Sequence, residues 1–224
     1  MRAAAAAVLL TAAASAAALA SADHQLARVR GDVRYALEGT PDKPVTGRVD
    51  LPATAGIGTG TRGLAALTLP DSSVIQIGGR TTMRIGDLDA NGARTVALTR
   101  GALRFTIRHP QGAPANYVFV TPTSQVAVRG TLAYLVVGPK GDQLYCVDCA
   151  AGDVSVRAAG EQYAVLSGQT LNVRRMNERA FDANLVANTS VNNPAIDQFL
   201  GDFSPFGRPA PDGADPTGSE SAAR

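Results

Sequence analysis

Tryptophan is absent from this 224-residue chain, and cysteine and histidine occur only twice each. A zinc site normally needs four such ligands and would have to use every cysteine and histidine of the chain, so we expect no metal or cofactor. Aromatic residues make up only 5%, so the core must rest on aliphatic side chains. The net charge of +2 gives no electrostatic basis for binding nucleic acid. The 45% hydrophobic content excludes a chain that is disordered throughout.

The one long apolar run lies at the N-terminus. Of residues 1–22, 13 are alanine and none is acidic; Arg2 precedes the run and Ala20-Ser21-Ala22 ends it. This order is typical of a secretory signal peptide, so cleavage is predicted near Ala20 or Ala22. A retained membrane anchor is the alternative, but alanine and serine offer little apolar area to a span of about 20 residues. We therefore expect a periplasmic or secreted protein with no stable membrane span after cleavage.

The C-terminal region, residues 177–224, differs in composition from the middle of the chain. Residues 204–224 are dominated by proline, glycine, serine and aspartate, which predicts a disordered tail. Residues 177–203 are predicted to form a short helical extension. Its best helix starts at the cap Asn193-Pro194 and ends at Gly201, and residues 180–188 are a weaker candidate. We expect the better helix to dock on the preceding domain through Ile196, Phe199 and Leu200.

Between Leu26 and Val173 the apolar residues alternate with period two and the runs are separated by glycine-containing turns. Alternation places one face of each strand inward, and no helical pattern interrupts it. We therefore expect residues 23–176 to form one all-β domain, an antiparallel β-sandwich or a solenoid-like roll of short strands. A regular β-helix is disfavoured, because glycines 101, 130, 152 and 168 do not hold one spacing.

The turns occur in a characteristic order. A Thr-Gly segment leads into a strand, a turn with an aspartate follows, and Gly-containing bends then separate pairs of strands. The motif positions are Gly60, Asp71, Gly101, Gly130, Thr131, Gly152 and Gly168. In this order, over about residues 27–173, the sequence resembles the FecR domain family.

The resemblance implies a periplasmic β domain of the kind found in regulators of iron-siderophore uptake. Those regulators also carry a cytoplasmic anti-sigma segment and one transmembrane helix, and their periplasmic domain responds to an outer-membrane receptor. In this sequence nothing precedes the signal peptide, and the region after Val173 is short and irregular. We therefore expect a stand-alone exported domain without direct anti-sigma activity.

Cys146 and Cys149 form a C-x-x-C pair in a protein that we expect to be exported. Redox catalysis would need a helix N-terminus to activate one thiol, and the surrounding residues indicate a strand entering a turn. An oxidising compartment favours a disulfide. In a straight strand residues i and i+3 lie about 10 Å apart, beyond disulfide reach. A bridge therefore predicts a tight bend at Val147-Asp148, whereas a straight strand predicts two free thiols.

Arginine supplies nearly all the positive charge, since only two of the 21 basic residues are lysine. Arg104 and Arg108 should share one strand face with Thr106. The simpler interpretation is a solvated face. The alternative is a pair of guanidinium groups that bind an anion.

No nucleophile elbow, phosphate loop or metal-protease motif is present in the sequence. The favoured hypothesis is therefore a non-enzymatic exported domain that binds an envelope protein or another surface component in signalling. A surface or adhesive module that binds acidic polysaccharide is the first alternative. A secreted enzyme with an unrecognised site is the second.

Overall fold

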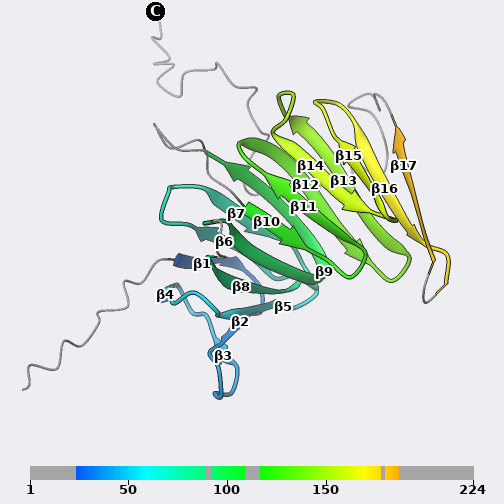
Figure 1. Cartoon of the computed structure of the whole chain (residues 1–224). Coiled ribbons are helices and arrows are strands. Elements are labelled where there is room, and N and C mark those ends of the chain that lie inside the picture. Colours follow the sequence, from blue (N-terminus) through cyan, green and yellow to red (C-terminus); the bar gives the residue numbers. More distant parts are fainter. Residues whose placement is uncertain (1–23, 89–91, 109–116, 178–179, 187–224) are drawn as a thin grey trace, which may run out of the picture.

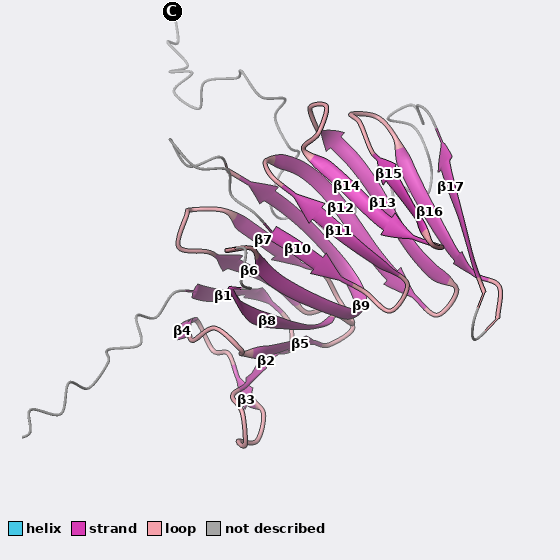
Figure 2. Cartoon of the chain, in the orientation of Figure 1, coloured by secondary structure: helices cyan, strands magenta, loops and turns pink. Residues whose placement is uncertain are grey.

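The computed structural model describes residues 24–88, 92–108, 117–177 and 180–186, and the described part is built from β-strands (Figures 1 and 2). The strands form two sheets that share one long strand, β9. Along sheet A the order is β4 (Arg48–Leu51), β1 (His24–Arg30), β6 (Leu64–Thr68), β7 (Val74–Ile77), β9 (Arg94–Ile107), β12 (Thr131–Gly138), β13 (Gly141–Asp148), β16 (Thr170–Arg175) and β17 (Phe181–Val186). Along sheet B it is β3 (Lys43–Pro44), β2 (Val33–Ala36), β5 (Gly56–Thr59), β8 (Thr82–Leu88), β9, β10 (Tyr117–Val120), β11 (Ser124–Val128), β14 (Val154–Ala158) and β15 (Glu161–Ala164).

Successive hairpins alternate between the two sheets. The hairpin β10–β11 lies in sheet B, β12–β13 in sheet A, β14–β15 in sheet B and β16–β17 in sheet A. The hairpin β14–β15 pairs with β11 and the hairpin β16–β17 pairs with β13, so the chain advances as a roll (Figure 1). Among the described strands all pairings are antiparallel except that of β9 with β10, which is parallel. The predicted all-β fold is confirmed.

The core lies between the sheets. The inward residues of sheet A and of sheet B belong to one buried apolar cluster, which the period-two alternation of both sheets supplies. At its centre the Phe105 ring of sheet A stacks on the Phe119 ring of sheet B, with centroids 4.4 Å apart. Both phenylalanines are 0% exposed, so these two rings join the sheets where no backbone hydrogen bond can.

Strand β9 passes from sheet B to sheet A by bending at Gly101. Residues 94–100 pair with β8, and residues 101–107 pair with β7 and β12. Gly101 has φ +105°, which side-chain-bearing residues rarely adopt, and it packs directly on Thr81. The Thr81 hydroxyl accepts a hydrogen bond from the Ala102 amide at 3.1 Å and fixes the bend. The glycine-containing turn predicts two strands in this segment, whereas the structure has one continuous strand.

The C-terminal end of the described region differs from the prediction. Residues 181–186, within the weaker helix candidate, form β17, which pairs with β16 in antiparallel register. The helix interpretation is wrong there because Phe181, Ala183 and Leu185 alternate and pack on the core. Sheet A therefore continues ten residues past the predicted boundary at residue 176. The predicted signal peptide, the helix over residues 193–201 and the tail lie outside the described residues.

Candidate binding groove on sheet B

The predicted turn at Asp71 connects the two sheets. Its carboxylate accepts hydrogen bonds from the Ser73 amide at 2.9 Å and the Ser73 hydroxyl at 3.0 Å. It also accepts one at 2.7 Å from the Tyr117 hydroxyl of β10, in the opposite sheet. The Ser73 hydroxyl in turn accepts the Arg108 amide at 3.0 Å. Asp71 therefore stabilises the fold, and its carboxylate is fully engaged in doing so.

Replacing Tyr117 with phenylalanine tests this connection. Burial, followed by the hydrogen bond and negative charge of Asp71, raises the pKa of the Tyr117 hydroxyl above its ordinary value. The folded state therefore holds this proton more tightly, and the stabilisation is complete below about pH 10 and lost as pH rises beyond it. In urea titrations, Tyr117→Phe should cost about 1.5–3 kcal/mol at neutral pH, and the difference from wild type should shrink above pH 10. A difference that stays constant up to pH 12 would contradict this role.

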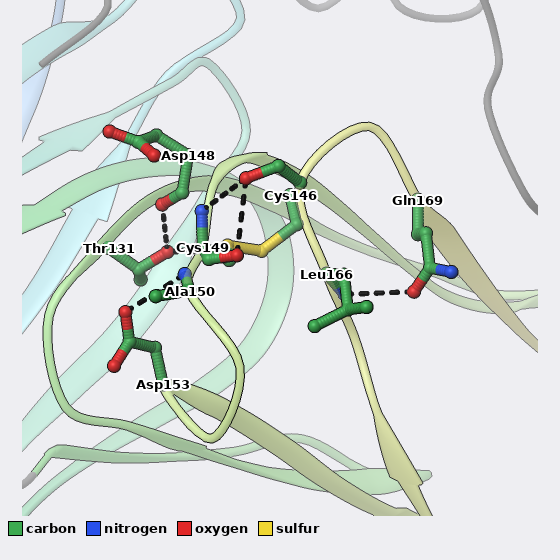
Figure 3. Close-up of a disulfide and its surroundings, with 9 residues drawn as sticks. Thr131, Cys146, Asp148, Cys149, Ala150, Asp153, Leu166 and Gln169 are labelled. Atoms are coloured by element: carbon green, nitrogen blue, oxygen red, sulfur yellow. Dashed lines mark hydrogen bonds between the residues drawn. A yellow bond between two sulfur atoms is a disulfide. The ribbon is translucent and has the colours of Figure 1, made fainter.

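Further motif positions lie in and next to the segment that carries the disulfide. Thr131 donates its hydroxyl proton to the Asp148 carbonyl at 2.6 Å (Figure 3). The Gly168 amide donates to the Cys146 carbonyl at 2.8 Å. Gly152 forms the following turn, which the Ala150 amide closes on the Asp153 carboxylate at 3.0 Å. Gly130 is buried immediately before β12. These motif residues therefore position the backbone.

Cys146 and Cys149 are bridged, with Cα atoms 6.0 Å apart. The register shows how a strand accommodates the bridge: Ala133 pairs with Cys146 and Leu132 pairs with Asp148, so Val147 is an extra residue in a β-bulge. In a straight strand the Cα atoms of Cys146 and Cys149 would lie too far apart for a disulfide, and the bulge shortens this distance. The bulge lies where a bridge predicts a bend. Both cysteines are buried, at 0% and 4% exposure, which gives the pair a structural role.

The bridge makes a quantitative prediction. Intact-mass measurement should show a gain of two hydrogens on reduction, and the double variant Cys146→Ala/Cys149→Ala should lose about 2 kcal/mol of unfolding free energy, as a short closed loop implies. The variant should keep its fold, because the bulge is also held by Thr131. An unchanged mass after full reduction of the unfolded protein would exclude the bridge.

The two candidate anion-facing arginines lie in different environments. Arg104 is on the outer face of sheet A but only 6% exposed, and its guanidinium carbon lies 5.9 Å from the centroid of the Tyr134 ring. Burial lowers the pKa of Arg104, and the electrostatic interaction with Tyr134 partly opposes this lowering. Tyr134, Leu64 and Ala102 form a second, smaller buried cluster there. Arg108 is exposed, so of the pair only Arg108 meets solvent directly.

The outer face of sheet B carries a groove of about 320 Å³ that crosses strands β2, β5, β8 and β9. Its floor is β5, where Gly56 and Gly58 point outward because Ile57 between them is buried in the core. The strand registers align four residues in one row across the groove: Arg34, Gly58, Thr82 and Arg100. All four line the groove.

Charged and hydroxyl groups form the walls of the groove. Arg34 pairs with Asp32 through a 3.4 Å contact, and both side chains are exposed. On the opposite wall Arg100 donates from Nε to the Thr82 hydroxyl at 3.1 Å. With neighbouring strands about 4.8 Å apart, the Cα atoms of the two arginines lie about 14 Å apart across the glycine floor. The arrangement can receive a flat, polar ligand between two guanidinium groups.

No pattern within one segment of the sequence predicts this groove. Its residues come from four separate segments, and register alone brings Arg34 and Arg100 to the same row. The one local signal was Gly56-Ile57-Gly58, a strand with glycine at alternate positions. Glycine in the interior of a strand marks a bend, a bulge or a site of close approach.

Two classes of feature are absent from the part of the chain that the structure describes. It contains no cluster of three or more histidine, cysteine, aspartate or glutamate side chains that could hold a metal ion. It also contains no helix with the length and apolar character needed to cross a membrane.

Comparison with known proteins agrees with the resemblance drawn from the turns. Residues 55–155 match the model of the family described as FecR protein. No curated protein matches the chain significantly. Two crystal structures of a proposed anti-sigma factor from Parabacteroides distasonis ATCC 8503 are similar at 18% identity and a TM-score of 0.49, and the alignment spans 59% of each chain. The matched residues run from the turn before the glycine floor to β14, and over this segment the chain is similar to the FecR family.

Proposed function

We propose that this protein is an exported, non-enzymatic signalling domain that binds a component of the cell envelope in the groove of sheet B. The observation that carries the proposal is the coincidence of the groove floor with the FecR domain. Gly56, Gly58, Thr82 and Arg100 all lie within residues 55–155. The family match supports a regulatory role, and the groove supplies a place for a ligand.

The engagement of the carboxylates supports a binding role over catalysis. Asp71 accepts three hydrogen bonds that hold a turn. Asp142 is 6% exposed and accepts hydrogen bonds from the Ser124 hydroxyl, at 2.8 Å, and from the Thr121 hydroxyl. Both carboxylates therefore connect sheet A to sheet B, and neither is available there as a catalytic acid or base. The acids of the groove itself are Asp32, which pairs with Arg34, and Asp42.

The export part of the proposal has its own test. Fusing residues 1–30 to alkaline phosphatase, which is active only outside the cytoplasm, should give an active reporter. Deleting residues 3–19 from the fusion should abolish the activity. The mature N-terminus should follow Ala20 or Ala22. A fusion that is inactive although it accumulates would contradict export.

The signalling part is tested by transcription. In the organism of origin, deleting the gene should change transcript levels of a limited set of envelope genes, and the intact gene should restore them. An expression profile that is the same with and without the gene under several envelope stresses would contradict a regulatory role.

A further inference from the structure

The two glycines of the groove floor are not required by the fold. A Cβ atom built on Gly58 would meet nothing within 4 Å, and one on Gly56 would only touch Ala36 at 3.8 Å. Neither glycine has a positive φ. By contrast, a Cβ on Gly63 would lie 2.9 Å from the Gly60 amide nitrogen and closer still to the Asp32 carbonyl, so that glycine is needed for packing.

A glycine in a strand interior destabilises the folded state relative to alanine. Gly56 and Gly58 incur this cost without relieving a clash or permitting an unusual backbone conformation. Their effect is to expose the flat face of the β5 backbone at the bottom of the groove. A flat surface of this kind allows a ring to approach the backbone closely.

The ligand must be recognised through side chains. Strand β5 is paired with β2 on one side and with β8 on the other, so its backbone is not open to an added peptide strand. The walls offer guanidinium donors from Arg34 and Arg100 and carboxylate acceptors from Asp32 and Asp42. A ligand rich in hydroxyl groups can both donate to and accept from such a lining.

The charge pattern favours one negative group on the ligand. Asp32 neutralises Arg34 at one wall. At the other wall Arg100 donates to the neutral Thr82 hydroxyl through Nε, which orients the guanidinium and leaves its two terminal nitrogens available. A fork of two parallel N–H groups matches a carboxylate. With two acids also in the lining, a densely charged polyphosphate would meet repulsion.

We propose that the groove binds a sugar ring that bears a carboxylate, as in the uronic acid units of an acidic polysaccharide. The ring lies on Gly56 and Gly58, its carboxylate pairs with Arg100, and its hydroxyls meet Asp32 and Asp42. This inference rests on the proposed binding function of the groove and names the chemistry of its ligand.

The test is calorimetric titration of the purified protein with trigalacturonic acid, maltotriose and inorganic phosphate. Trigalacturonic acid should bind about ten- to a hundredfold more tightly than maltotriose, the factor expected for hydrogen bonds to a charged group. Arg100→Gln should reduce the affinity for trigalacturonic acid to that for maltotriose. Added salt should weaken the binding of the acid and leave that of maltotriose unchanged.

The groove itself is tested by filling it. Gly58→Ile should abolish binding while the protein stays folded, because isoleucine suits a strand and its Cβ would meet no atom within 4 Å there. Gly47→Ile is the matched control, since Gly47 also has open space and no positive φ but lies outside the groove; it should bind as the wild type does.

Three results would overturn the inference: equal affinity for maltotriose and trigalacturonic acid, equally tight binding of phosphate, or unchanged binding by a folded Gly58→Ile protein. The inference would also be overturned if the protein bound none of the three probes. None of these results would decide the signalling role, which the transcription experiment measures separately.

Discussion

Replacing Gly101 with valine is expected to lower the free energy of unfolding by at least about 4 kcal/mol, a large part of the about 5–15 kcal/mol that stabilises an ordinary domain. Gly101 has φ +105°, and its added Cβ would lie 2.7 Å from the Thr81 Cβ and closer to the Thr81 Cα. The valine would therefore combine backbone strain with a collision against neighbouring backbone. Because β9 joins the sheets at this residue, the loss should affect the whole roll. Thermal and urea unfolding would measure it.

Gly152→Val is the matched control for that experiment. Gly152 also has a positive φ, +89°, but a Cβ there would meet nothing within 4 Å. Its cost should be limited to backbone strain, about 1–2 kcal/mol. If the Gly101 and Gly152 variants lost the same stability, the close packing of Gly101 on Thr81 would not be what fixes the bend.

Phe119→Ala is the second change with a large expected effect, a loss of about 3–5 kcal/mol. Phe119 is 0% exposed and its ring stacks on Phe105 across the interface between the sheets. Truncation would remove buried apolar area and leave a cavity in the layer that joins sheet B to sheet A. Denaturant unfolding would give the loss directly.

Val118→Ala provides the comparison within the same strand. Val118 is only partly buried, and its side chain points to the opposite face of β10. Its loss should stay below about 1.5 kcal/mol. Equal losses for the two variants would mean that the core does not lie between the sheets as described.

The local features of the fold could be predicted from the sequence. Residues that are neighbours in the chain predict the turn at Asp71. Neighbouring residues also predict the bend in β13 that a disulfide between Cys146 and Cys149 requires. Alternation of apolar residues identified the β-domain and its inward faces. The turn, the bend and the alternation each depend on residues that are close together in the chain, so the sequence shows them directly.

Features that depend on pairing between distant strands could not be predicted. Gly101 indicated a break between two strands, because the sequence does not show that Thr81 supports a bend within one strand. The apolar positions in residues 181–186 are compatible with a helix or a strand. They form a strand because the edge of β16 offers backbone groups with which they pair. The groove needs the registers of β2, β5, β8 and β9 together, so no local pattern contains it.

The central proposal is that the protein signals through its glycine-floored groove. The most direct measurement is complementation of a gene deletion with the Gly58→Ile and Gly47→Ile variants, followed by quantification of the transcripts that the deletion alters. We expect the Gly47→Ile variant to restore wild-type levels and the Gly58→Ile variant, present at the same abundance, to leave the levels of the deletion. Restoration by both variants would contradict the claim, because a filled groove would then transmit the signal as well as an open one.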